Sequence, residues 1–537
     1  MNAPLLSHLL ITHPDRPLCS TVVRRFYAGA DIGHRGPSPH QSGHAANNTS
    51  ALLHAAAVSR AIQLEVERGH VCGPFTQPPL ASFHVNPLSA RLKPDGSARL
   101  ILDLSQPRGA SVNDGIDPAE FSCSYTSVDE AIALVFMNGG RGALLAKADI
   151  KHAFRLIPVS PEQWHLLGFQ WNKVFYFDTR LSFGSRSSPR IFNDFAACLA
   201  WIFRTHSNNP LVRHYLDDFF LVAPSLSVAS RTYNTILDQS RDLGVPLAAD
   251  KCVPPTTRLV LLGVEIDTDS MTISMPAEKC ASLLDKLQAL ANRPKAKRRT
   301  LLSVVGILGH ASKCIPPGRG FTRRILDAAL SVARPGHRVR LTAALQRDVQ
   351  WWLTFLPQWN GTFPLIPPRP WATCLQVHTD SSGTAGAAVH RDLWISFPWP
   401  AGATAAADCS MTWLELVPVV AALFAWGPLW RGRRVQFFCD NMGVIGVWRR
   451  GWSHNPLLMD AIRQLLFLSA VNECVMDFEY IPSAHNSVAD ALSRGNIARA
   501  RRVQPSLQPT PGAVPEALSS YLASPLTGAH HLTGRKL

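Results

Sequence analysis

The stretch RHYLDDFFLVAP, Arg213 to Pro224, places two adjacent aspartates between two apolar runs. The residues before Asp217 and after Asp218 are apolar enough for buried strands, so the pattern predicts two short strands that meet at a charged turn. A solvated hairpin tip is the alternative, because acidic residues are common in turns. If both strands are buried, the two carboxylates are held rigidly, and their position requires a chemical reason.

The composition indicates a large, multidomain protein with a basic surface. The 537 residues are 46% hydrophobic and 17% charged, which is enough apolar material for roughly three or four packed domains. Lys and Arg exceed Asp and Glu by 53 to 38, and the net charge of +15 suits a polyanionic partner such as nucleic acid. A basic surface that binds nothing is the alternative.

Several protein classes do not fit the sequence. The 11 cysteines include no CxxC pair and no Cys/His set at zinc spacing, so we expect reduced thiols in an intracellular protein of the cytoplasm, the nucleus or both. The N-terminal residues lack the basic start and long apolar core of a signal peptide. The longest apolar run, Leu414 to Trp430, contains an acid and two prolines, which favours a buried helix over a membrane span.

Changes in patterning divide the chain into six segments. They are a disordered or irregular N-terminal arm (1–50), a first α/β or α+β segment (51–276), a helical segment (277–358), a proline-rich linker (359–371), a second α/β segment (372–496) and a basic, mostly disordered tail (497–537). Within the first α/β segment we expect strands at 98–104, 143–150 and 174–179 and a helix at 189–203.

A third aspartate, Asp149, ends the expected strand 143–150. Two acidic strand ends in one sheet repel each other unless a cation lies between them, and few, hard oxygen ligands suit Mg²⁺, with Mn²⁺ as an alternative. Two such ions about 4 Å apart can support an in-line displacement at phosphorus. Because neighbouring strand residues point to opposite faces, we expect Asp217 to share the metals with Asp149 and Asp218 to contribute more peripherally. A turn or cap role is the common alternative for a single such aspartate.

The segment 372–496 carries a second set of acids at the ends of expected elements. Asp380 and Asp440 each end an apolar strand, and Glu415 starts a helix. Asp490 lies near another helix start, with His485 in the loop before it. Each residue alone is more often structural, but four acids at equivalent ends of an alternating α/β pattern indicate a second site for two Mg²⁺ ions.

The first segment resembles reverse transcriptases. The motifs KADIKHAF, LSFGSRSSPRIF, YLDD, LGVPLAADKC and LLGVEID occur in the order found in that family, over about 80–270. The resemblance implies a right-hand polymerase, with fingers and palm over 51–276 and thumb and connection helices over 277–358. It also implies that Asp149 and Asp217 are the metal-binding pair of the palm, with Asp218 beside them.

The same resemblance implies which residues contact the substrates. They are Lys93, Arg99, Phe154, Phe183, Gly184 and Lys251. Arg99, assisted by Lys93, would contact the incoming triphosphate, since a guanidinium donates to phosphate oxygens in a fixed fork. Phe154 would exclude a ribose 2′-hydroxyl, Phe183 and Gly184 would lie under the template–dNTP pair, and Lys251 would help pyrophosphate to leave.

The second α/β segment resembles ribonuclease H. TDSSG, LEL, DN and AHNSVADALSR occur in the order of that family, over 372–496. The resemblance implies a ribonuclease H-like α/β domain in which Asp380, Glu415, Asp440 and Asp490 bind two Mg²⁺ ions. The substrate would be the RNA strand of an RNA–DNA hybrid, and His485 would assist proton transfer or product release.

Together the two resemblances predict a retrotransposon enzyme that copies RNA into DNA and then degrades the spent template. Its partners would be an RNA template, a DNA primer, RNA–DNA hybrids, dNTPs and other element-encoded proteins, with no membrane. The motif spacing is most similar to DIRS-type (tyrosine-recombinase) elements, and gypsy-like elements and pararetroviruses are the alternatives. A catalytically inactive or host-adopted nucleic-acid-binding protein is the alternative of another class.

Overall fold

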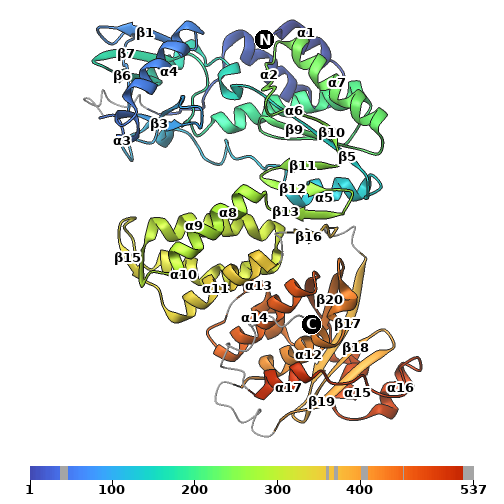
Figure 1. Cartoon of the computed structure of the whole chain (residues 1–537). Coiled ribbons are helices and arrows are strands. Elements are labelled where there is room, and N and C mark those ends of the chain that lie inside the picture. Colours follow the sequence, from blue (N-terminus) through green and yellow to red (C-terminus); the bar gives the residue numbers. More distant parts are fainter. Residues whose placement is uncertain (37–45, 359–361, 368–372, 401–408, 452, 524–537) are drawn as a thin grey trace. The chain divides into compact units, whose positions relative to one another are not determined.

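The computed structural model describes residues 1–537 apart from 37–45, 359–361, 368–372, 401–408, 452 and 524–537 (Figure 1). The chain forms two compact units. One consists of Met1–Ser127 and Met137–Leu259, and the other of Val128–Phe136 and Val260–Leu537. The sequence-based boundary at 276 therefore falls inside the second unit.

The centre of the first unit is a four-stranded antiparallel sheet. Its order is β10 (Val253–Thr256), β5 (Leu144–Asp149), β9 (Asp218–Ala223) and β8 (Val212–Tyr215). Two amphipathic helices, α6 (Ser188–Ser207) and α7 (Leu226–Leu243), pack against it and share its core. This packing fixes the hairpin that carries the two adjacent aspartates.

A second sheet and a hairpin complete the first unit. The sheet has the order β1 (Val71–Phe75), β7 (Val174–Asp178), β6 (Gly168–Trp171) and β2 (Val85–Asn86), and the hairpin joins β3 (Leu88–Leu92) to β4 (Ala98–Leu102). The strands expected at 98–104, 143–150 and 174–179 and the helix expected at 189–203 are confirmed, with ends that differ by a few residues.

The prediction of a disordered or irregular arm at 1–50 is wrong for its first half. Residues Ala3–Leu9 form α1 and Arg16–Ala28 form α2, and Asn2 and Asp15 cap them by accepting hydrogen bonds from backbone amides. Val22 is fully buried in the core of the first unit. The helices escaped prediction because each is short and contributes only a few buried residues. Residues 37–45 lie outside the described part of the chain.

The helical segment predicted at 277–358 is confirmed. It contains α8 (Ala277–Ala291), α9 (Arg298–Cys314), η4 (Pro316–Phe321), α10 (Arg323–Leu330) and α11 (Ala343–Gln358). The expected linker 359–371 is not wholly a linker, because Thr362–Pro364 form β16 and pair with β13 (Thr272–Ser274). Proline is tolerated there because β16 is the edge strand of its sheet. The rest of that segment lies largely outside the described residues.

The second α/β segment is a five-stranded mixed sheet with helices packed on it. Its order is β19 (Leu393–Pro398), β18 (Ala385–His390), β17 (Cys374–Ser381), β20 (Arg434–Cys439) and β21 (Val475–Tyr480). The first three strands are antiparallel, whereas β17, β20 and β21 run parallel. Its core includes side chains of α12 (Met411–Trp426), α13 (Met442–Arg450) and α14 (Pro456–Val471).

The apolar run predicted as a buried helix is confirmed as one. In the described part of the chain, Met411–Trp430 is the one helical stretch long and apolar enough to cross a membrane, and 72% of its apolar window is buried in the protein. Trp413 and Leu416 are among its fully enclosed side chains. Its apolar composition is thus explained by its place inside the domain core.

The tail is more ordered than predicted. Ile497–Val503 form α16 and Glu516–Ala523 form α17, which corrects the expectation of disorder for this part of 497–537. Leu518 and Tyr521 are fully buried in the core of the mixed sheet and its helices. These contacts are long-range, which explains why the local pattern did not predict them. Residues 524–537 lie outside the described part.

Candidate active sites

The opening stretch forms the hairpin of β8 and β9. Phe219, Phe220 and Leu221 are each 1% exposed or less, so the predicted burial is confirmed for β9, whereas β8 is only partly buried beyond Val212. Leu216 adopts a positive φ of 51°, a left-handed backbone conformation that reverses the chain just before the aspartates. The hairpin therefore projects its two carboxylates from a rigid, buried base.

Strand register brings the third aspartate to the same place. Asp149 at the end of β5 lies directly opposite Asp218 at the start of β9, and the backbone amide of Ile150 donates to the carbonyl of Asp217 at 2.9 Å. Directly opposite residues on antiparallel strands project their side chains to the same face of the sheet. The register thus brings the carboxylates of Asp149 and Asp218 together, and Asp217, in the turn before β9, lies close enough for the charge of Asp149 to act on it.

The three acids are crowded enough to perturb one another. Burial, and then the charge of Asp149, raises the pKa of Asp217 above its usual range, and the same causes raise the pKa of Asp218 to about 6. A divalent cation would relieve this repulsion, and a set of carboxylate oxygens is the donor set that Mg²⁺ prefers, so the residues fit the expected metal. The charge of Asp149 acts on both neighbours, but strand register sets Asp218, and not Asp217, directly opposite it. The alternation of strand faces therefore does not place Asp217 with Asp149, and the ranking of Asp217 above Asp218 stays a prediction from the resemblance.

Lys251 lies against this acid set. Its Nζ donates to Oδ1 of Asp149 at 2.9 Å and to Oδ2 at 3.2 Å, while its side chain is 54% exposed. Burial alone would lower the pKa of Lys251, but the hydrogen bond and charge of Asp149 outweigh it and raise the pKa. The ammonium therefore stays charged at the site, as its predicted role toward pyrophosphate requires.

Three of the predicted substrate-contacting residues form a single cluster. The guanidinium of Arg99 lies 4.9 Å from the ring centroid of Phe183, and the rings of Phe183 and Phe154 are 5.0 Å apart. The positive charge of Arg99 also acts on Asp217, so the cluster borders the acids. Lys93 lies at the exposed tip of the β3–β4 hairpin, and no described contact joins it to the acid set.

The turn at Gly184 is held by a residue that the sequence analysis did not identify. Gly184 has a φ of +113°, and a Cβ there would lie 1.9 Å from the carbonyl oxygen of Leu102. Asn113 donates to the carbonyl of Gly184 at 2.9 Å and accepts from the amide of Arg186 at 2.8 Å. No motif marks Asn113, because its partners are distant in sequence.

The second acid set gathers at the carboxyl ends of parallel strands. Asp380 lies near the end of β17, and Asp440 follows the end of its parallel neighbour β20. Glu415 lies just past the first turn of α12, rather than at its start as expected, and has a carboxylate oxygen 3.8 Å from the sulfur of Cys439. Potential ligand atoms of Glu415, Cys439 and Asp440 lie within 4.8 Å of one another, so this corner can hold a cation.

Burial and mutual repulsion are strong in this second set. Burial, and then the charges of Asp380 and Asp440, raises the pKa of Glu415 to about 8. Burial raises the pKa of Asp380 to about 6, although Ser493 donates to its Oδ2 at 2.6 Å. A shared cation would stabilise the charged form of these carboxyl groups, because it offsets both their burial and their mutual repulsion. The residues therefore again fit the expected Mg²⁺.

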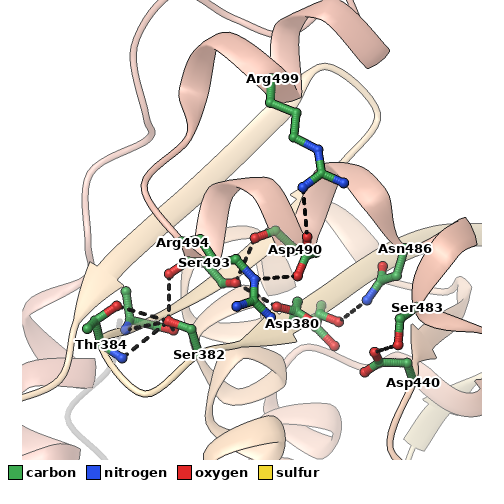
Figure 2. Close-up of polar contacts among 12 residues, drawn as sticks. Asp380, Ser382, Thr384, Asp440, Ser483, Asn486, Asp490, Ser493, Arg494 and Arg499 are labelled. Carbon is green, nitrogen blue, oxygen red and sulfur yellow. Dashed lines mark hydrogen bonds and ion pairs between the residues drawn. The ribbon is translucent and has the colours of Figure 1, made fainter.

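Figure 2 shows how the remaining acids are held. Arg494 donates to Oδ1 of Asp490 at 2.6 Å, and Arg499 of α16 approaches its Oδ2 at 3.5 Å. Ser483 donates to Oδ2 of Asp440 at 2.5 Å. These hydroxyl and guanidinium partners were not identified from sequence, although Arg494 lies inside the quoted motif.

His485 lies in the short helical turn Ser483–His485 and is exposed. Within the described part of the chain, no contact joins its ring to the acids. Its role in proton transfer or product release therefore stays a prediction.

Comparison with known proteins supports a reverse transcriptase domain in this chain. Residues 115–266 match the family described as reverse transcriptase (RNA-dependent DNA polymerase), a range that includes Asp149, Asp217 and Asp218. The Pol polyprotein of Feline endogenous virus ECE1 is 28% identical over 123 residues, which are 21% of this chain and 12% of the polyprotein. The Tf2-3 transposon polyprotein of Schizosaccharomyces pombe (strain 972 / ATCC 24843) is 21% identical over 419 residues, 75% of this chain and 28% of the polyprotein.

The chain therefore spans less than a third of either relative. A solved foamy viral protease-reverse transcriptase, described in complex with double-stranded DNA, superposes with a TM-score of 0.50 and 16% identity over 90% of this chain and 82% of that one. This likeness confirms the predicted fold class, a mixed α/β multidomain fold. The chain carries a reverse transcriptase domain of the type found in retrotransposon and retroviral polyproteins.

Proposed function

We propose that this chain is an RNA-directed DNA polymerase with a C-terminal ribonuclease H activity. The observation that carries the polymerase assignment is the register that sets Asp149 opposite Asp218, next to Asp217. When bound, two Mg²⁺ ions per site (or Mn²⁺) would supply activation of the attacking oxygen and stabilisation of the departing one in both reactions.

The side chains around the first acid set would position the nucleotide. Arg99 would hold the triphosphate of a dNTP, and the ring of Phe154 would leave no room for a ribose 2′-hydroxyl. Phe183 and Gly184 would support the pair between template and dNTP. Lys251 would neutralise the departing pyrophosphate, a role supported by the charged state of its ammonium beside Asp149.

The second acid set supports hydrolysis of RNA in a hybrid. Asp380, Glu415, Asp440 and Asp490 would hold the metals, and His485 would assist proton transfer or product release. The carboxyl ends of parallel strands in an α/β sheet are a common place for such a site. A polymerase that copies RNA leaves an RNA–DNA hybrid, so the two activities would act in succession.

The partners would be an RNA template, a DNA primer and their hybrid, together with other element-encoded proteins. The foamy viral protein is described with double-stranded DNA, and the net charge of +15 suits a nucleic-acid duplex. The element would be a DIRS-type retrotransposon by motif spacing, and the protein would work inside the cell.

Primer extension tests the polymerase. The full chain should incorporate dTTP on poly(rA)/oligo(dT) with Mg²⁺, and Asp217→Asn should abolish incorporation. Asp242→Asn, an exposed aspartate on α7, is the matched control and should leave the rate unchanged. Full activity of Asp217→Asn would overturn the assignment. Tight binding of the hybrid with neither activity would instead favour an inactive or host-adopted nucleic-acid-binding protein.

A further inference from the structure

The second unit contains a cavity of about 500 Å³ that belongs to neither acid set. Arg434 and Val475, at the amino ends of β20 and β21, lie on its wall. Asp440, in contrast, follows the carboxyl end of β20, which is 6 residues long. At about 3.3 Å per residue, the cavity and the acids lie at opposite ends of the strand, roughly 20 Å apart.

The cavity wall is strongly basic. Its charged side chains are six cations and two acids, Asp129 and Asp477, and acids on and beside the wall neutralise part of the positive charge. Arg434 pairs with Asp477 at 2.8 Å, and Arg323 pairs with Asp327 at 2.9 Å. The remaining cations have no acidic partner within the described ranges. They are Lys313, Arg319, Arg449 and Arg450.

Between these cations the wall is apolar. Ile462 and Leu466 of α14 and Phe363 of β16 line it together with the indole of Trp448 at the end of α13. The indole is only partly buried, and its ring lies 4.7 Å from that of Phe478. A flat apolar surface beside a cluster of exposed cations suits a ligand with a planar ring and several negative charges.

The walls of the cavity are fixed by buried contacts. Asp348 of α11 is 1% exposed and accepts from Arg463 of α14 at 2.5 Å, with Arg324 at 3.6 Å. A Cβ on Gly320 of η4 would lie 2.0 Å from a methyl group of Leu466, so the helical segment and α14 are in close contact. The cavity is therefore formed before any ligand arrives, which limits the entropic cost of binding.

We propose that this cavity binds a free nucleoside triphosphate. Its phosphates would contact the four unmatched cations, of which the arginines can donate two hydrogen bonds each, and its base would lie on the apolar wall near Trp448. Neither acid set takes part, so the proposal goes beyond polymerisation and RNA cleavage. Because the cations come from α9, η4 and α13, a bound triphosphate would join the helical segment to the ribonuclease H-like sheet.

Equilibrium dialysis of labelled ATP with the full chain tests this site. EDTA and the absence of primer and template prevent metal-dependent binding at both acid sets. Arg449→Ala/Arg450→Ala should weaken ATP binding by at least about tenfold, because it removes two charge-assisted contacts. Arg293→Ala/Arg299→Ala makes the same change in net charge on exposed residues outside the cavity, and should change the affinity by less than about twofold.

Competition with other ligands identifies which part of ATP the cavity recognises. An unchanged melting temperature of each variant shows that the variant is folded. Tripolyphosphate should displace labelled ATP more weakly than unlabelled ATP does, and adenosine should displace it more weakly still. Equal weakening by both double variants, or no saturable ATP binding by the wild-type chain, would overturn the proposal. Displacement by oligo(dA) at lower concentrations than by ATP would overturn the assignment to a free nucleotide. Primer extension is not part of the readout, so failure here leaves the polymerase assignment untouched.

Discussion

Asp149 and Asp218 lie opposite each other on antiparallel strands, whereas Asp380 and Asp440 leave the carboxyl ends of parallel strands. In the first set, the register of two strands brings Asp149 and Asp218 together, and among the described residues Lys251 forms the ion pair with this set. In the second set the acids come from two strands and two helices, and serine hydroxyls and arginines hold them. The same ligand chemistry thus depends on the pairing of two strands in one site and on the packing of several elements in the other.

The largest effect is expected when one predicted metal ligand is replaced in each site, because each replacement should affect only one of the two activities. Asp149→Asn should reduce primer extension by more than about a hundredfold, because changes to outer-sphere partners alone cost roughly ten- to a hundredfold. Release of labelled RNA from a hybrid should remain near the wild-type rate. Asp440→Asn should show the reverse pattern. Loss of both activities in either variant would show that the two sets are not independent sites.

A smaller but still large effect is expected at the turn beside the first set. Gly184→Ala adds a Cβ that would clash with the carbonyl of Leu102 at a φ of +113°. Such strain costs about 1–3 kcal/mol or more, so primer extension and the melting temperature should both fall. Gly306→Ala is the control, because Gly306 is helical and its Cβ would meet nothing within 4 Å. A fully active Gly184→Ala enzyme would mean that the turn does not position the substrate.

The hydroxyl partners of the second set should have an intermediate effect. Ser493→Ala removes the hydrogen bond to Asp380, and we expect hybrid cleavage to fall by roughly ten- to a hundredfold. The Mg²⁺ concentration for half-maximal cleavage should rise, while primer extension stays unchanged. Ser519→Ala, on an exposed position of α17, should behave as wild type. An unaltered Mg²⁺ dependence in Ser493→Ala would contradict a role in orienting Asp380.

The smallest effect is expected at Glu65, whose carboxylate is paired with His70 and Arg155. Burial would raise the pKa of Glu65, but the hydrogen bond from His70 and the charge of Arg155 outweigh it and lower the pKa to about 2. A carboxyl group whose pKa is lower in the folded than in the unfolded protein stabilises the folded state at any pH above its unfolded pKa. For Glu65 this stabilisation is lost as the pH falls from about 4.5 to about 2. Glu65→Gln should therefore lower the free energy of unfolding by about 1–2 kcal/mol at pH 7.

Urea unfolding at several pH values measures this contribution. The difference between wild type and Glu65→Gln should shrink as the wild-type carboxylate becomes protonated at low pH. Glu67→Gln, an exposed neighbour on the same helix, should unfold like wild type throughout. A difference that stays constant down to pH 2 would show that Glu65 contributes through packing rather than charge. Either way, the result shows how a buried carboxyl with a lowered pKa behaves, in contrast to Asp218, Asp380 and Glu415, whose pKa values are raised.

Much of the fold was predictable because its signals are local. The apolar flanks of Asp217 and Asp218 predict a hairpin, whose second strand is buried, and the strand before Asp149 is predicted with nearly correct ends. The first helices and the tail were missed, because α1, α2, α16 and α17 are short and are stabilised by distant partners. Asn113 was missed for the same reason, since it acts on a turn far along the chain.

The sequence by itself determined which acids this protein has and at which element ends they lie. Hydrophobic periodicity and chain order are properties of neighbouring residues, and they suffice to place Asp149, Asp217 and Asp380 at strand ends. Only the tertiary structure decided that Asp149 faces Asp218, that Lys251 contacts Asp149 and that Arg499 approaches Asp490. Strand register and helix docking depend on the burial of side chains contributed by many segments, and a local pattern cannot encode that sum.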